Sequence, residues 1–487
     1  MNEIYKLTAS EIREKIANKE LTAYEVTEAV FERIEKKDEL INSFVSLRKE
    51  AALQEAKIID EKIARGEKVG ALAGVPVSIK DNMVSTGDLT TACSKILGNY
   101  TGIYDATVVK KLKEADAVII GKTNMDEFAM GGTTRTSSHG LTKNPWDTTK
   151  VPGGSSGGAA TSIATQECFI SLGSDTGGSI RQPSSFCGVV GLKPTYGRVS
   201  RYGLIAFASS LDQIGPIAKS VEDVALTMNV IAGADEYDAT VSKKEVPDYT
   251  KALGRDIKGM KIGVPKEYFI EGIDEGVRKV MLESLDKLRE LGAEIVDISL
   301  PHTKYAVPVY YVLAPAEASS NLARFDGVRY GYRSPEAKNI LDLYIKSRSE
   351  GFGAEVKRRI MIGTYVLSAG FFDAYFKKAQ KVRSLIKKDF DEAFKTVDVI
   401  FTPVAPSPAF ELNKEKTPIE LYLEDIFTLS ANLAGIPGLS VPAGLTNGLP
   451  VGIQLLGKQF GEEDLIAVGS AFEKIRGEWK LPEGEDK

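Results

Sequence analysis

Two short clusters rich in glycine and hydroxyl residues constrain this chain more than any other feature of its sequence. The first reads GGSSGG at 153–158, and the second reads GSDTGGS at 173–179. The segment between them has the pattern of a short helix followed by an apolar strand at 168–172. Because glycine accepts positive φ and permits close backbone approach, both clusters predict tight turns at the ends of one helix–strand unit. The serines of the two turns can then meet across a pocket.

The flanking sequence alternates between helical and strand patterns, which predicts an α/β fold. Apolar spacing favours helices at 8–19 and 22–37, and Thr22 with Glu25 fits a capping box, so a leading helical hairpin is expected at about 8–37. A buried strand at 74–82 carries Lys80. We expect one large domain over 1–487, with a mixed, mostly parallel sheet covered by helices on both faces. A mainly helical insertion is expected at about 307–397. Further expected elements are helices at 49–65, 107–114, 124–130, 221–231 and 274–292, and strands at 117–120, 261–265, 294–299, 399–403, 439–442 and 450–456.

Composition excludes several classes of protein. The formal net charge is -5, and no basic run is interleaved with aromatic residues, which argues against a chain that grips nucleic acid by itself. The three cysteines are too scattered for a disulfide framework or a zinc site, and reduced thiols are expected. The N-terminus lacks the apolar core of a signal peptide, and no window reaches about 18 apolar residues. We therefore expect a cytoplasmic protein without a metal.

Lys80 is the candidate general base. A serine nucleophile needs a base, and neither His139 nor His302 lies in a context that suits this role. A lysine at the end of an apolar strand can be neutral, because burial lowers its pKa. The alternative is an ion pair with Asp81 or another acid, which would keep the lysine charged.

Two serines compete for the role of nucleophile. Ser155 formally fits the pattern G-x-S-x-G, but Pro152 and polar residues precede it instead of the strand that a nucleophile elbow requires. A phosphate loop is also disfavoured, because no Gly-Lys-Ser/Thr follows the first cluster. Ser179 instead opens a helix and follows a run of backbone N–H groups that can converge on an oxyanion. These donors belong to Thr176, Gly177, Gly178 and Ser179 itself.

The two clusters, extended to GSDTGGSIR and followed by CGVVGLKPT, resemble the signature of the amidase signature family. The resemblance implies that fold and a Ser-Ser-Lys mechanism with Ser179 as nucleophile, Ser155 as relay after a cis peptide bond, and Lys80 as base. Three further stretches resemble one branch of the family, the glutaminase subunits of tRNA-dependent amidotransferases. They are TNMDEFAMG at 123–131, SSNLARFDG at 319–327, and GFG at 351–353 with KRR at 357–359.

This branch implies hydrolysis of glutamine and transfer of the ammonia to a partner subunit. The partner converts Glu-tRNA(Gln), with Asp-tRNA(Asn) as a second candidate, to the amidated form. The resemblance further implies a heterotrimer with B and C subunits, in which the partner binds ATP and Mg and mainly holds the tRNA, while this chain binds no cofactor. Two alternatives remain: a stand-alone amidase of small amides, and a non-catalytic assembly subunit, against which the intact Ser-Ser-Lys set argues.

The branch also implies residues that bind glutamine. An arginine suits the α-carboxylate and an aspartate suits the α-ammonium, and the matching positions are Arg359 and Asp425, with Tyr310 as a hydroxyl donor. From the residues alone, an arginine in a helical run more often lies on a solvated face.

Overall fold

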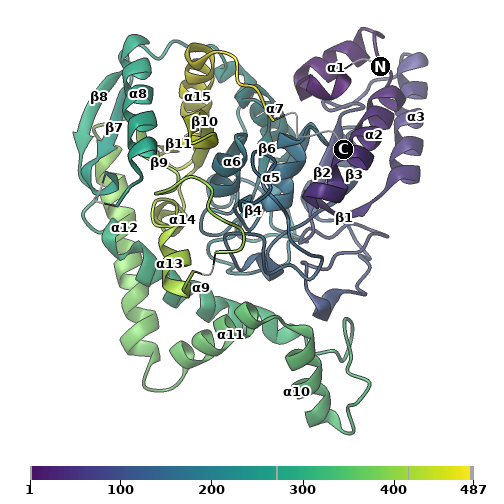
Figure 1. Cartoon of the computed structure of the whole chain (residues 1–487), viewed down its shortest axis with the longest axis vertical. Helices are drawn as coiled ribbons and strands as arrows, with labels where there is room; N and C mark the ends of the chain where they lie inside the picture. The colour runs from purple at the N-terminus through teal and green to yellow at the C-terminus, as the bar shows by residue number, and fades with distance from the viewer. Residues whose placement is uncertain (1–2, 270–271, 415, 483–487) are drawn as a thin grey trace.

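One mixed sheet of eleven strands runs through the computed structural model, which describes residues 3–269, 272–414 and 416–482 (Figure 1). The strands lie in the order β1-β3-β2-β4-β6-β5-β10-β11-β9-β7-β8. The described residues therefore form a single α/β unit. The strands are β1 (Phe44–Leu47), β2 (Pro76–Lys80), β3 (Val118–Thr123), β4 (Ile170–Asp175), β5 (Val190–Lys193), β6 (Gln213–Ala218), β7 (Lys261–Pro265), β8 (Glu294–Ile298), β9 (Val399–Pro403), β10 (Gly438–Thr446) and β11 (Leu449–Gly457).

The expected mixed sheet is confirmed, but the expected excess of parallel pairs is wrong. Among the described strands, four pairings are parallel and six are antiparallel. The antiparallel share is large partly because β10 and β11 form a hairpin closed by Asn447 and Gly448, both with positive φ. Such a two-residue turn joins antiparallel strands only, whereas parallel strands need a long crossover.

Helices cover both faces of this sheet. At β10, successive residues point to opposite faces: a Cβ built on Gly438 lies 3.1 Å from Arg181 Cδ in α6, whereas Leu439 Cδ2 lies 2.7 Å from a Cβ built on Gly469 in α15. The helices are α1 (Ala9–Ala17), α2 (Ala23–Ile41), α3 (Lys49–Ala64), α4 (Thr107–Glu114), α5 (Gly157–Ala164), α6 (Arg181–Cys187), α7 (Val221–Ile231), α8 (Glu275–Glu290), α9 (Ala306–Asn321), α10 (Ile340–Gly351), α11 (Ala354–Leu367), α12 (Lys378–Ala393), α13 (Pro418–Leu423), α14 (Leu429–Ala434) and α15 (Glu462–Arg476).

Local signals place several helices where the sequence predicts them. The capping box at Thr22 and Glu25 is confirmed and starts α2. The stretch 307–397 contains nearly all of α9 and the whole of α10, α11 and α12; α10 and α11 lie at the bottom of Figure 1. The helix expected at 124–130 is a single 3-10 turn at 127–129, because Phe128 and Ala129 adopt positive φ. No helix among the described residues is long and apolar enough to cross a membrane.

The sheet brings the two glycine-rich turns to one edge. Strands β2 and β4 are parallel neighbours, with Ile79 opposite Leu172, so their carboxyl ends lie together. Lys80 ends β2 and Asp175 ends β4, while α5 begins at Gly157 within the first cluster and α6 begins just after the second. In open α/β sheets, sites form where strand ends and helix starts meet in this way.

We expect Gly215→Ala to destabilise the sheet. Gly215 lies in β6, and a Cβ at this position would overlap the carbonyl oxygen of Leu192 in the adjacent strand β5. Overpacking of a buried strand costs about 1–3 kcal/mol of unfolding free energy, measurable by urea denaturation. Gly98→Ala is the control, because its nearest neighbour would be Lys95 O at 3.4 Å. Equal urea midpoints for both variants would contradict this packing.

Candidate active site

The ammonium group of Lys80 is fully buried and surrounded by serines. Its Nζ donates to Ser155 Oγ at 2.7 Å, Ser156 Oγ at 2.8 Å and Ser174 Oγ at 3.0 Å, and it lies 3.3 Å from the Ser174 carbonyl oxygen. Among the described residues no carboxylate forms an ion pair with Lys80. The partners of Lys80 are therefore neutral hydroxyl and carbonyl groups, and none of them is a carboxylate.

The alternative of an ion pair between Lys80 and Asp81 is wrong. The Asp81 carboxylate accepts hydrogen bonds from the Thr91 hydroxyl and the Cys93 backbone N–H. Burial lowers the pKa of Lys80 to about 7, although the charges of Asp126 and Asp175 oppose this shift. A substantial fraction of Lys80 is therefore neutral near pH 7 and can accept a proton.

The first glycine-rich turn presents Ser155 to this lysine. The Gly154–Ser155 peptide bond is cis, as the family resemblance implies. The Ser155 carbonyl oxygen accepts from the Asp126 N–H at 3.2 Å, and Gly154 N–H donates to Gln182 Oε1 at 3.1 Å. The Asp126 carboxylate in turn binds the N–H groups of the loop at 133–136. The branch-like run at 123–131 thus supports the turn that carries Ser155.

Ser179 lies in the second turn, and the two turns are hydrogen-bonded to each other. Ser156 N–H donates to the Ser179 carbonyl oxygen at 3.1 Å. Ser179 is 7% exposed, and its hydroxyl forms no hydrogen bond within the described part of the chain. The structure thus brings Lys80, Ser155 and Ser179 together and makes the Lys80–Ser155 contact, while the Ser179 hydroxyl is left available for a substrate.

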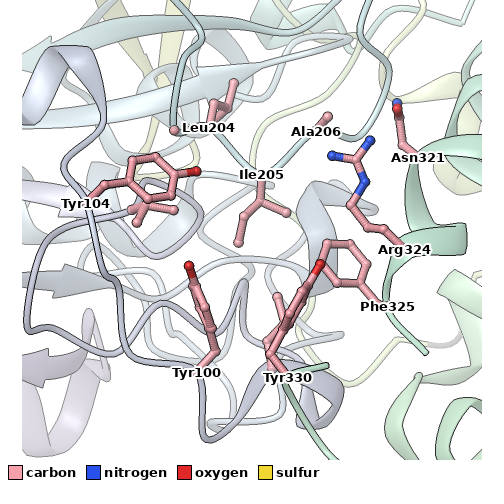
Figure 2. Close-up of a pocket in the computed structure, with 12 residues that line it drawn as sticks. Tyr100, Tyr104, Leu204, Ile205, Ala206, Asn321, Arg324, Phe325 and Tyr330 are labelled. Carbon is pink, nitrogen blue, oxygen red and sulfur yellow. The ribbon is translucent and has the colours of Figure 1, made fainter. Parts of the chain in front are cut away.

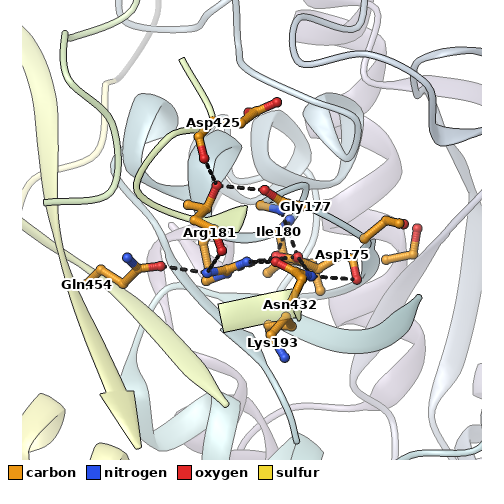
Figure 3. A network of polar contacts seen from close by, with 12 residues as sticks. Asp175, Gly177, Ile180, Arg181, Lys193, Asp425, Asn432 and Gln454 are labelled. Atoms are coloured by element: carbon orange, nitrogen blue, oxygen red, sulfur yellow. Dashed lines mark hydrogen bonds and ion pairs between the residues drawn. The ribbon is translucent and has the colours of Figure 1, made fainter. Parts of the chain in front are cut away.

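A buried ion pair fixes the second turn (Figure 3). Arg181 Nε and Nη2 each lie 3.0 Å from a carboxylate oxygen of Asp175, and the guanidinium also donates to Asn432 Oδ1 and Gln454 Oε1, both at 2.6 Å. Burial disfavours the charged carboxylate, but the Arg181 guanidinium overrides this and holds the pKa of Asp175 below its usual range. Asp175 therefore remains ionised.

Gly178 is not a free oxyanion donor, contrary to the sequence-based expectation. Its N–H donates to Asp175 Oδ1 at 2.8 Å, because a carboxylate at the start of a tight turn reaches the N–H three residues later. The N–H groups of Thr176, Gly177 and Ser179 have no acceptor among the described residues. These three donors are thus the ones open to an oxyanion.

Tyr310 is buried beside this turn, and Arg359 is buried next to the neighbouring Tyr311. A Cβ built on Gly177 would lie 2.8 Å from the Tyr310 hydroxyl, so Tyr310 in α9 contacts the second turn. Arg359 in α11 is 4% exposed, and its Nε donates to Glu355 Oε1 at 2.8 Å. Its guanidinium also lies 5.5 Å from the centre of the Tyr311 ring. Arg359 is therefore not on a solvated face.

Asp425 precedes α14 and faces the same region. Tyr311 donates its hydroxyl to Asp425 Oδ2 at 3.3 Å. Burial raises the pKa of Asp425 to about 8, while the Arg359 charge opposes the shift. A ligand with a positive charge would favour the ionised form of this carboxyl.

An aromatic cavity of about 130 Å³ lies nearby but outside the serine site (Figure 2). None of Lys80, Ser155 and Ser179 lines it. The cavity is lined by Val84, Leu97, Tyr100, Tyr104, Gly203, Leu204, Ile205, Ala206, Asn321, Arg324, Phe325 and Tyr330.

Within the described ranges no group of three His, Cys, Asp or Glu side chains is placed to hold a metal ion.

Sequence comparisons place the chain close to one group of proteins. The family model described as "Amidase" matches residues 25–466. A protein from Fusobacterium nucleatum, named as the A subunit of glutamyl-tRNA(Gln) amidotransferase, is 69% identical over 481 residues, which cover 99% of each chain. A protein of the same name from Carboxydothermus hydrogenoformans is 60% identical over 473 residues, which cover 97% of this chain and 98% of the relative.

Solved structures share the fold more widely. The crystal structure of the glutamyl-tRNA(Gln) amidotransferase A subunit from Thermotoga maritima has a TM-score of 0.82 at 43% identity, covering 99% of this chain and 98% of that one. Native peptide amidase from Stenotrophomonas maltophilia has a TM-score of 0.84 at 29% identity, with 98% of both chains covered. The two solved structures thus have similar TM-scores, although their sequence identities to this chain differ.

We expect Asp175→Asn to destabilise the protein strongly. The change leaves the buried Arg181 guanidinium without its counter-charge, and breaking a buried pair from one side costs about 3–5 kcal/mol of unfolding free energy. Asp391→Asn is the matched control, because it breaks an exposed pair with Lys387 that contributes less than about 1 kcal/mol. Urea unfolding measures both, and comparable losses would show that the buried pair is not a main support of the turn.

Proposed function

The chain belongs to the amidase signature family, and we propose that it is the glutamine-hydrolysing subunit of a tRNA-dependent amidotransferase. The observation that carries the chemistry is the 2.7 Å contact between Lys80 Nζ and Ser155 Oγ beside Ser179. The choice of reaction is supported by relatives that are 54% to 69% identical over nearly the whole chain and carry the name of an amidotransferase subunit.

In the proposed reaction, Ser179 Oγ attacks the side-chain amide carbon of glutamine. Its proton passes to Ser155 Oγ as Ser155 gives its own proton to neutral Lys80. The N–H groups of Thr176, Gly177 and Ser179 donate to the oxyanion of the tetrahedral intermediate. The relay then runs in reverse, the C–N bond breaks, and ammonia leaves with the returned proton. Water hydrolyses the acyl-enzyme through the same relay and releases glutamate.

Three side chains, two buried and one partly buried, suit the two charged groups of a free amino acid. We assign the α-carboxylate to the Arg359 guanidinium and the α-ammonium to Asp425, with Tyr310 as a hydroxyl donor beside the second turn. A buried cation and a partly buried acid that are close enough for their charges to interact favour a zwitterion over a simple amide. This charge pattern is the argument against the stand-alone amidase.

The ammonia would pass to a partner subunit in a heterotrimer with B and C subunits. That partner would bind ATP and Mg, mainly hold the tRNA, and amidate Glu-tRNA(Gln), with Asp-tRNA(Asn) as a second candidate substrate. The relatives' names describe a subunit rather than a whole enzyme. Large apolar side chains are exposed along α10 and α11, including Leu341 at 65% and Met361 at 69%, and a partner commonly covers such surfaces.

We expect Ser179→Ala to abolish the release of ammonia from glutamine by the complex that co-purifies with this chain. Loss of the nucleophile should lower kcat by at least about 1,000-fold. Ser384→Ala, an exposed serine on α12, is the control and should retain full activity. Full activity in Ser179→Ala would refute the assigned nucleophile. If the wild-type chain cleaves simple amides and ignores glutamine, the stand-alone amidase is correct.

The pH dependence of glutamine hydrolysis should report the proton acceptor. Because Lys80 must be neutral and its pKa is about 7, kcat at saturating glutamine should rise with pH and level off above about 7. The measurement uses kcat because kcat/KM would also report the ionisation of Asp425, whose pKa is about 8 in the free chain. A rise in activity around pH 7 is usually assigned to the deprotonation of a histidine. The double variant His139→Gln with His302→Gln is therefore the control, and this rising limb of the pH profile is compared with that of the wild type. The limb should persist in that variant. Its disappearance there would assign the base to a histidine.

A further inference from the structure

Gln182 carries a buried hydrogen-bond donor that has no partner. It lies in the first turn of α6, three residues after Ser179, and is 1% exposed. Its Nε2 is buried and makes no hydrogen bond within the described part of the chain. A buried amide N–H without an acceptor is costly, so an unpaired donor in a site points to a group that arrives from outside.

The orientation of this amide follows from its other end. Gln182 Oε1 accepts the Gly154 N–H at 3.1 Å. Exchanging the oxygen and nitrogen would set two N–H donors against each other, so the oxygen must face Gly154. The Nε2 group therefore points away from the first turn and cannot be satisfied by rotating the amide.

The free Nε2 and Asp425 both lie near Gly132. A Cβ built on Gly132 would lie 3.6 Å from Gln182 Nε2 and 3.8 Å from Asp425 Oδ1. No hydrogen bond joins these two side chains among the described contacts. A donor and an acidic acceptor thus both lie close to Gly132, and the donor is three residues after Ser179.

We propose that Gln182 is a positioning residue that donates its Nε2–H to the α-carboxylate of the substrate. The α-ammonium and α-carboxylate of an amino acid are attached to one carbon, so an acceptor and a donor side by side match them. Asp425 binds the ammonium, and Gln182 shares the carboxylate with Arg359. The proposal rests on glutamine hydrolysis as the function and adds a residue that selects for the free α-carboxylate.

A purely structural role for Gln182 is distinguishable. That role uses only Oε1, which holds the first turn through Gly154, and it makes no demand on Nε2. Gln182→Glu keeps the shape and the acceptor for Gly154 but replaces the donor with a carboxylate oxygen, which repels the α-carboxylate. Gln182→Met keeps the shape and removes both polar groups.

The test is the ratio of kcat/KM for glutamine to kcat/KM for 4-aminobutanamide, which lacks only the α-carboxylate. Ammonia release is measured with the co-purified complex. We expect Gln182→Glu and Gln182→Met to lower this ratio about 10- to 100-fold, mainly through a higher KM for glutamine. The ratio does not depend on how much of a variant is folded, because both substrates report on the same active molecules.

Asp425→Asn is the matched comparison. It should instead lower the ratio of glutamine to glutaramate, the analogue that lacks only the α-ammonium. An unchanged glutamine to 4-aminobutanamide ratio in both Gln182 variants would overturn the proposal and leave Gln182 with its contact to Gly154. Wild-type complex that releases no ammonia from glutamine would refute the proposed function itself, and the proposal about Gln182 with it.

Discussion

The buried ion pair between Asp175 and Arg181 is the interaction on which the rest of the site depends. Its carboxylate binds the N–H groups of Gly178 and Ile180, which sets the path of the turn that presents Ser179. Its guanidinium reaches Gln454 in β11, so the turn is tied to a strand far away in sequence. A pair removed from water is tolerated only when its remaining donors and acceptors are satisfied, and here the surrounding amides supply them.

The same core holds a second cation in the opposite manner. Arg181 has a carboxylate partner and stays charged, whereas Lys80 has only hydroxyls and a carbonyl, so burial brings its pKa to about 7. The choice of residue follows from this difference. A guanidinium cannot lose its proton in a protein and suits a structural pair, while an ammonium can and suits proton transfer. The structure thus holds a permanent charge and a labile one in the same core, with separate tasks.

Features that depend on local sequence were predictable, and features that depend on distant contacts were not. The glycine-rich turns, Lys80 and the cap of α2 follow from short patterns. The engaged N–H of Gly178 depends on the path of one turn, and the burial of Arg359 depends on rings from other segments. Gln182 gave no signal, because a polar residue in a helix is normally exposed. The short strands β5 and β6 and helix α15 were missed. The fraction of strand pairings that are parallel was overestimated, because the sequence of a strand does not specify which strand it pairs with.

The central position of β10 and β11 means that the sheet can be completed only late in synthesis of the chain. These are the last strands in sequence, yet they lie between β5 and β9 in the middle of the sheet. While a ribosome is still synthesising the C-terminal region, the nascent chain holds two partial sheets whose facing edges are unpaired and prone to wrong pairing. Arg181 also lacks Gln454 until then. The turn that carries Ser179 therefore gains its full set of contacts only once β11 has been synthesised.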